Sequence, residues 1–109
     1  MSLDSPANHG LDKLTVRRIV DLLAEYPEIR RVILFGSRAK GNFRPGSDID
    51  LCLDAPGLNL SRQLDIETRL DDLLLPWKID LVHLQAIDNP ALLEHIERVG
   101  VVLTDAPVA

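Results

Sequence analysis

The stretch LFGSRAKGNFRPGSDIDL, residues 34–51, decides how this chain is organised. It contains a Gly-Ser pair, Gly36-Ser37, and an Asp-x-Asp group, Asp48-Ile49-Asp50, with ten residues between them. A Gly-Ser pair alone is more often a turn, and Asp-x-Asp alone is usually a solvated strand edge. Their combination at this spacing, each beside a strand-like run, instead indicates a site that binds a nucleotide and metal ions.

Strand and helix patterns extend outward from this stretch. Residues 31–35 predict a buried strand, and residues 48–54 predict a second strand with one apolar face. Further strands are expected over 78–84 and 101–103. Helices are expected over 11–26 and 60–75 and from Asn89-Pro90 to about Arg98, with a short helix or turn over 37–40 and a loop over 41–47.

This order of elements predicts an α/β or α+β fold, with a small mixed β-sheet of about four strands flanked by helices. We expect residues 1–10 to be a flexible tail and residues 11–109 to form a single domain. With 109 residues, the chain has room for one hydrophobic core. A large acceptor would have to be held by few residues here, or by a second protein.

Three carboxylates are candidate metal ligands and catalytic residues. Asp48 and Asp50 point to the same face of a strand, with their backbones about 6–7 Å apart. Asp80 lies in another apolar run and can join them if the two strands are neighbours. Oxygen ligands of this kind suit Mg²⁺, or Mn²⁺ as the alternative, rather than zinc. We expect two metal ions, absolute metal dependence, and Asp80 as the proton acceptor.

The Gly-Ser pair and the basic residues after it are candidate phosphate ligands. Glycine at position 36 lets the backbone approach a phosphate. The Ser37 hydroxyl and the N–H groups of the next turn can donate to phosphate oxygens. Arg38, Lys40 and Arg44 place positive charge beside them, so the sequence predicts a nucleoside triphosphate as substrate.

Composition excludes several classes of function. The net charge of −5 and the aromatic content of 4% argue against extended nucleic-acid binding. One cysteine cannot form an internal disulfide. No apolar run approaches the roughly 20 residues that span a bilayer, and the N-terminus does not have the pattern of a signal peptide. We therefore expect a cytoplasmic protein with no membrane partner.

Five other residues have both a structural and a functional interpretation. For Cys52, on the same strand face as Asp50, packing is favoured. Trp77 is more typical of a core end than of base stacking. His83 is expected to be structural, and His95 to pack or face solvent. Lys78 is equally compatible with a phosphate contact and a solvated strand end.

The residues 34–41, LFGSRAKG, followed by 47–51, SDIDL, resemble the DNA polymerase β-type nucleotidyltransferase superfamily. The short length is similar to its minimal nucleotidyltransferases, the MNT or MntA-like antitoxins. The resemblance covers about residues 12–104, with its specific positions at 34–51 and 78–82. It implies the polymerase β-type fold, with phosphate bound by Gly36 and Ser37 and metal held by Asp48, Asp50 and Asp80.

The same resemblance implies a partner and a reaction. Minimal members are paired with a small helical HEPN-type protein, the toxin, which they would neutralise by moving AMP from ATP to a partner tyrosine. Two alternatives stay open: an antitoxin that silences its partner by binding alone, and an antibiotic-type nucleotidyltransferase acting on a small molecule. Base preference, acceptor residue and oligomeric state, including a homo-oligomer, are also open.

Overall fold

The computed structural model describes residues 10–103. Of the tail expected over residues 1–10, only Gly10 belongs to the described part. The helices are α1 (Lys13–Leu23), α2 (Gly36–Lys40), α3 (Leu60–Asp71) and α4 (Pro90–Val99), with a 3-10 turn at Leu84–Ala86. The strands are β1 (Arg31–Phe35), β2 (Ile49–Asp54), β3 (Ile79–His83) and β4 (Val101–Val102). The predicted order of elements is confirmed.

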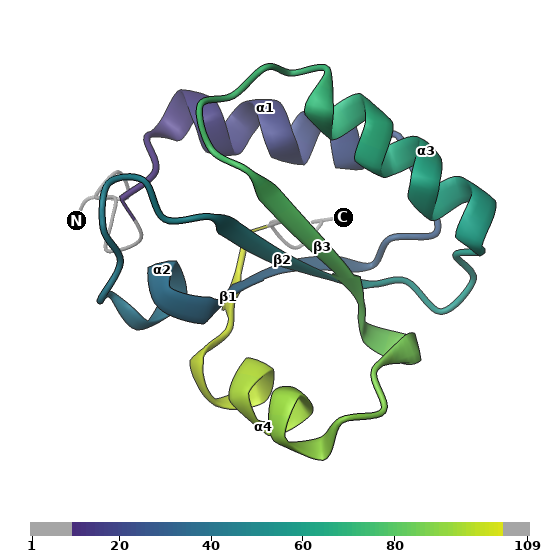
Figure 1. Ribbon diagram of the computed structural model, residues 1–109. Coiled ribbons are helices and arrows are strands. Elements are labelled where there is room, and N and C mark those ends of the chain that lie inside the picture. Colours follow the sequence, from purple (N-terminus) through teal and green to yellow (C-terminus); the bar gives the residue numbers. More distant parts are fainter. Residues whose placement is uncertain (1–9, 104–109) are drawn as a thin grey trace.

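The four strands form one mixed sheet in the order β3-β2-β1-β4. β1 is antiparallel to β2 and to β4, whereas β2 and β3 are parallel. Helix α3 makes the connection that parallel neighbours require (Figure 1). The sheet therefore brings the start of β2 next to the start of β3 and to the end of β1.

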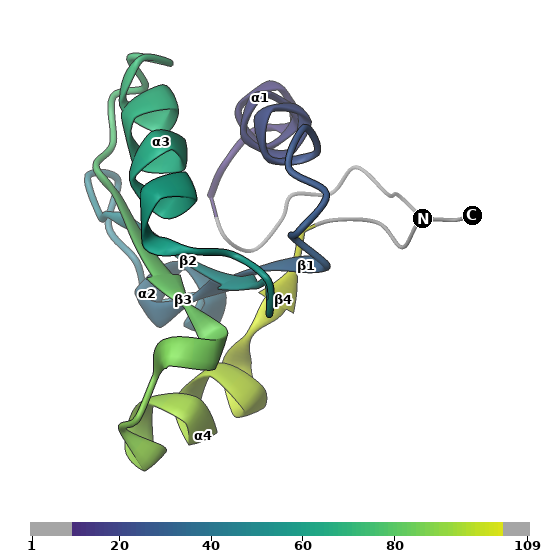
Figure 2. The same ribbon diagram turned by 90° about the vertical axis from the view of Figure 1, so that its right-hand side faces the viewer.

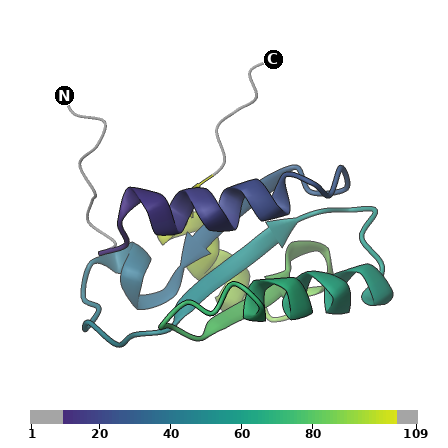
Figure 3. The ribbon, with the colours of Figure 1, turned by 90° about the horizontal axis from the view of Figure 1, so that it is seen from above.

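Helices cover both faces of this sheet. α1 and α3 lie over one face, and α2 and α4 lie under the other (Figure 2). Seen from above, α1 and α3 lie side by side across the strands (Figure 3). The sheet residues buried beneath α1 and α3 are Val32, Leu34, Ile49, Leu51 and Leu53.

A second, smaller cluster lies on the opposite face, between the sheet and α4. It consists of Ile33, Phe35, Cys52 and Ile96. The prediction of one apolar face on β2 was therefore incomplete, because Cys52 faces the α4 side and is fully buried. On that face of β2, Asp50 lies toward the start of the strand and the buried Asp54 lies at its end.

Side-chain caps set where α3 and α4 begin. The Asn59 side chain accepts a hydrogen bond from Arg62 N at 2.8 Å. The Asn89 side chain accepts from Ala91 N at 2.9 Å, and Pro90 occupies the first helical position. Each cap provides an acceptor for a backbone N–H group that has none within the helix. The predicted N-cap at Asn89 is confirmed.

Two helices end earlier than their apolar patterns predicted. α1 ends at Leu23, and α3 ends at Asp71, followed by Leu74 with a positive φ of 56°. Leu14 and Leu64 are 68% and 52% exposed, so they lie outside the buried stripes.

Within residues 10–103, no helix has the length and apolar character needed to cross a membrane.

Candidate active site

The Gly-Ser pair forms the junction between β1 and α2. Gly36 begins the helix with a φ of +78°, a conformation that L side chains rarely adopt. A Cβ atom at this position would overlap Oδ2 of Asp50. Asp50 lies there because it is the antiparallel partner of Phe35. Glycine is therefore required for backbone conformation and for close approach, and the two halves of the motif meet.

Asp50 and Asp80 are neighbours across the parallel strands. Their Cα atoms are register partners, and Asp50 shares its strand face with Cys52, which packs against α4, so both carboxylates lie on that face. The condition set for Asp80, that its strand be a neighbour of β2, is met by the strand order. Burial raises the pKa of Asp50, and the charges of Asp80 and Asp48 raise it further. Crowded carboxylates of this kind favour a bound cation.

Asp48 does not lie together with Asp50 and Asp80 as a compact group of three carboxylates in this structure. It is exposed and precedes β2, although its charge acts on Asp50. Within residues 10–103, no three His, Cys, Asp or Glu side chains are gathered closely enough to hold one metal ion. The donor chemistry suits Mg²⁺, but metal binding by Asp48, Asp50 and Asp80 stays a prediction.

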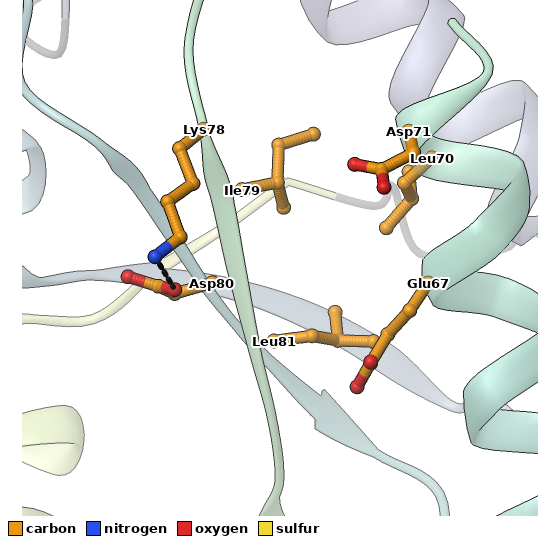
Figure 4. Close-up of a pocket in the computed structure, with 7 residues that line it drawn as sticks. All are labelled: Glu67, Leu70, Asp71, Lys78, Ile79, Asp80 and Leu81. Atoms are coloured by element: carbon orange, nitrogen blue, oxygen red, sulfur yellow. Dashed lines mark ion pairs between the residues drawn. The ribbon is translucent and has the colours of Figure 1, made fainter.

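A cavity of about 320 Å³ lies beside Asp80, between α3 and β3. It is lined by Glu67, Leu70, Asp71, Lys78, Ile79, Asp80 and Leu81. In Figure 4, Ile79 and Leu81 point toward α3, whereas Lys78 and Asp80 point to the other side of the strand. The Lys78 Nζ atom is 3.7 Å from Oδ1 of Asp80, whose side chain is 46% exposed. Asp80 is therefore accessible from this edge of the sheet.

All five predicted phosphate ligands lie on α2 or the loop after it, and Ser37, Lys40 and Arg44 are three of them. Ser37 is partly buried in the first turn of α2, and its carbonyl oxygen accepts from Gly41 N at 3.0 Å. Lys40 and Arg44 are exposed. Ser37 follows the Gly36–Asp50 junction directly. Phosphate contacts by all three stay predictions.

Arg38 has a structural environment that the sequence did not reveal. Its side chain is buried, with Nε donating to Ser47 O and Nη2 to Pro45 O, each at 3.1 Å. The guanidinium also lies over the rings of Phe43, at 4.9 Å, and Trp77, at 5.4 Å. Burial lowers the pKa of Arg38 from its usual value. Arg38 therefore holds the α2–β2 loop against the start of β3, and its assignment to phosphate stays a prediction.

The structure also places the residues that had two interpretations. Trp77 donates from Nε1 to Pro45 O at 2.9 Å and packs against the core, as predicted. His83 Nε2 lies 2.7 Å from Ala55 O, which confirms a structural role. Cys52 is fully buried, and burial raises the pKa of its thiol to about 11.

His95 belongs to the site, although the sequence assigned it to packing or solvent. Its Nε2 atom accepts a hydrogen bond from Gly36 N at 3.2 Å. Its ring meets Phe35 edge-on, with centroids 6.1 Å apart. A single histidine in a helix gives no sequence signal of such a contact, because the contact depends on how α4 packs under β1.

Comparison with known proteins finds a matching family model and similar sequences. Residues 17–107 match the sequence model of the family "Polymerase beta, Nucleotidyltransferase". Two proteins of Methanocaldococcus jannaschii are similar in sequence. "Putative protein adenylyltransferase MJ1217" is 31% identical over 78% of this chain and 87% of the relative. "Putative protein adenylyltransferase MJ0126" is 33% identical over 69% of this chain and 76% of the relative.

Solved structures resemble this chain over more than four fifths of its length. A chain in a crystal structure of a toxin–antitoxin with AMP-PNP is 26% identical, with a TM-score of 0.68 over 82% of this chain and 72% of that one. A chain from a complex of a tri-AMPylated Shewanella oneidensis HEPN toxin with an MNT antitoxin is 24% identical, with a TM-score of 0.65. It covers 84% of this chain and 71% of its own, and shows a shared fold.

Proposed function

Because this chain belongs to the polymerase beta nucleotidyltransferase family, we propose that it transfers AMP from ATP to a hydroxyl group of a partner protein. The observation that carries the proposal is the junction of Gly36 with Asp50, which is itself paired with Asp80. The Gly-Ser turn and two acidic side chains thus meet on one sheet face. The two archaeal relatives named as protein adenylyltransferases support the same reaction.

The proposed step is an in-line displacement at the α-phosphorus of ATP. The acceptor oxygen forms a bond to this phosphorus, the bond to the bridging oxygen of the β-phosphate breaks, and pyrophosphate leaves. Asp80 takes the proton of the acceptor hydroxyl. Its side chain is 46% exposed and lies on β3, the edge strand of the sheet, so an acceptor can approach it from that edge. Ser37, Lys40 and Arg44 bind the polyphosphate.

We assign Asp48, Asp50 and Asp80 as ligands of two Mg²⁺ ions. The raised pKa of Asp50, caused by its burial and by its two acidic neighbours, supports the assignment. The ions would supply charge neutralisation for the triphosphate and Lewis-acid activation of the acceptor. The residues themselves orient the reacting groups on one face of the sheet, and Gly36 leaves the space that Asp50 occupies.

The partner we propose is a small helical protein of the HEPN type, with this chain as its antitoxin. The structural likeness to a chain in a toxin–antitoxin crystallised with AMP-PNP supports this pairing. So does the likeness to the complex that holds a tri-AMPylated HEPN toxin. The net charge of −5 is compatible with a protein acceptor rather than with nucleic acid.

Intact-mass measurement of the partner tests the proposal. A candidate HEPN-type partner protein is incubated with the enzyme, ATP and Mg²⁺. We expect its mass to increase by one or more adenylyl groups, and to stay unchanged with EDTA or with Asp50→Asn. Asp88→Asn, an exposed aspartate outside the site, is the matched control and should transfer normally. An unmodified partner at saturating ATP would refute the acceptor assignment.

A second arm separates catalysis from binding. The Asp48→Asn/Asp50→Asn double variant is co-expressed with the partner, and cell growth is measured. Loss of protection indicates that neutralisation requires transfer. Full protection by a folded double variant would instead favour an antitoxin that acts by binding alone. Turnover with a small hydroxylated acceptor and no protein partner would favour the antibiotic-type alternative.

A further inference from the structure

A residue of α4 forms a hydrogen bond with the Gly-Ser turn. His95 projects from the middle of that helix, and its Nε2 atom lies 3.2 Å from the backbone nitrogen of Gly36. The neighbouring residue on the helix, Ile96, is buried among Ile33, Phe35 and Cys52 and fixes α4 to the sheet. His95 is therefore presented to the turn by a helix that is itself anchored.

The direction of this hydrogen bond defines which nitrogen of the His95 ring is the acceptor. The backbone N–H of Gly36 donates, so Nε2 is the acceptor and carries no proton. In the neutral ring the proton then resides on Nδ1. The edge-on contact with Phe35, at an interplanar angle of 82°, restricts the ring further. The ring is thus held in one tautomer and one orientation relative to the turn.

The hydrogen bond from Gly36 to His95 restrains the backbone at the start of the Gly-Ser turn. Gly36 has a φ of +78° and leaves room for Asp50, so its peptide orientation sets where Ser37 and the first turn of α2 point. Glycine can leave this conformation at little cost. The hydrogen bond from its N–H group to His95 favours the observed conformation over others.

We propose that His95 is a positioning residue for nucleotide binding: by accepting the Gly36 N–H group, it holds the Gly-Ser turn ready for the phosphates. This inference rests on the proposed function, since it concerns the same nucleotide. It assigns the first N–H group of the turn to His95. Phosphate recognition is then left to the Ser37 hydroxyl and to the residues that follow it.

Two substitutions separate the hydrogen bond from the packing of the ring. His95→Phe keeps an aromatic ring against Phe35 and removes the acceptor. His95→Gln gives up the ring but can place an amide oxygen near the position of Nε2. Ile96→Val is the packing control, because it removes a buried methylene next to the site without touching Gly36. All three are compared by thermal unfolding before any ligand is added.

The test measures the dissociation constant for a non-hydrolysable ATP analogue with Mg²⁺, and the exchange rate of the Gly36 amide proton by NMR. For His95→Phe we expect affinity to fall about 3- to 10-fold, the range for losing one hydrogen bond, with faster amide exchange. His95→Gln should bind within about twofold of the unmodified protein. Ile96→Val should lower the unfolding temperature and leave affinity unchanged.

Two results would overturn the inference. Equal or tighter binding by His95→Phe would mean that the imidazole competes with a phosphate for the Gly36 N–H group. Equal weakening by His95→Gln and His95→Phe would mean that the ring, not the acceptor, matters. If the unmodified protein fails to bind the analogue, the proposed function fails. The amide-exchange measurement needs no nucleotide, so it still tests whether His95 holds the turn. Slow exchange of the Gly36 amide proton should be lost in His95→Phe and kept in His95→Gln.

Discussion

Oδ2 of Asp50 occupies the space that a side chain on residue 36 would need, so Gly36 and Asp50 fit together only because residue 36 is glycine. The two residues belong to the separate halves of the sequence motif, and the pairing of Phe35 with Asp50 brings them together. The spacing between Gly-Ser and Asp-x-Asp is thus the length of chain needed to form α2 and return along β2. The sequence motif therefore corresponds to a contact between Gly36 and Asp50 in the folded chain.

Gly36→Ala should therefore harm the site more than its backbone conformation alone explains. A residue other than glycine at positive φ costs about 1–2 kcal/mol. Gly41→Ala is the matched control, since Gly41 also has positive φ, +87°, but a Cβ atom there would meet nothing within 4 Å. We expect Gly41→Ala to lose about 1–2 kcal/mol of unfolding free energy in urea. Gly36→Ala should lose more than this, and it should also lose AMP transfer.

Equal loss of stability in the two glycine variants, with transfer retained in both, would show that Asp50 can move away without consequence. The geometry of the Gly36–Asp50 junction would then not matter for the reaction. Transfer assays and urea unfolding on the same two preparations make this comparison directly.

The buried guanidinium of Arg38 should contribute more to stability than the exposed one of Arg44. Arg38→Met keeps similar volume but removes the donors to two loop carbonyl oxygens and the contact with two aromatic rings. We expect a loss of about 3 kcal/mol for Arg38→Met. For Arg44→Met, exposed on the same loop, we expect a change within about 0.5 kcal/mol. Chemical denaturation measures both.

A reversed pattern for these two arginines would contradict this role. If Arg38→Met unfolded normally and lost only nucleotide affinity, Arg38 would act as a phosphate ligand, as its place in the sequence motif first suggested. The structure instead supports a loop anchor, because its donors bond to backbone carbonyl oxygens.

Acid should remove a stabilising contact outside the site. Arg62 donates to both carboxylate oxygens of Glu28, at 2.7 and 2.9 Å. The hydrogen bond from Arg62 lowers the pKa of Glu28 from 4.5 to about 2. Because the folded pKa is lower than the unfolded one, the stabilisation is present above pH 4.5 and is lost as the pH falls through about 2.

Unfolding free energies of the unmodified protein and of Glu28→Gln, measured from pH 7 downward, should therefore differ by a constant amount at first. The difference should narrow below the unfolded pKa and vanish at the acid end. A difference that does not vary with pH would show that the ion pair contributes nothing through its charge.

The single thiol should be inert in the folded protein. Cys52 is fully buried, and burial raises its pKa to about 11, so almost no thiolate forms near neutral pH. We expect no reaction with a thiol reagent at pH 8 and complete reaction after unfolding in urea. Rapid labelling of the folded protein would mean that the sheet face under α4 opens readily.

Much of the fold could be predicted, because its signals are local. β1 is a short apolar run closed by a glycine, and the cap at Asn89 with Pro90 marks the start of α4. The end of α1 was misplaced because the first helix breaker after it is Pro27, and the end of α3 because leucines continue past it. Leu74 extends the apolar pattern of α3 in sequence, yet it has a positive φ and is 85% exposed.

The candidate site could be predicted only where spacing carries the information. Asp50 and Asp80 were found because strand periodicity fixes which face they occupy, and the strand order then made them neighbours. The contact from His95 to Gly36 and the burial of Arg38 depend on tertiary packing. Neither leaves a periodic pattern in the sequence.

The most direct test of the central claim is a crystal structure with Mn²⁺ and a non-hydrolysable ATP analogue, using anomalous scattering to locate the ions. We predict anomalous peaks about 2.1 Å from carboxylate oxygens of Asp50 and Asp80, with Asp48 turned toward them and the phosphates over the Gly36-Ser37 turn. Peaks elsewhere, or a nucleotide bound away from these carboxylates, would contradict it.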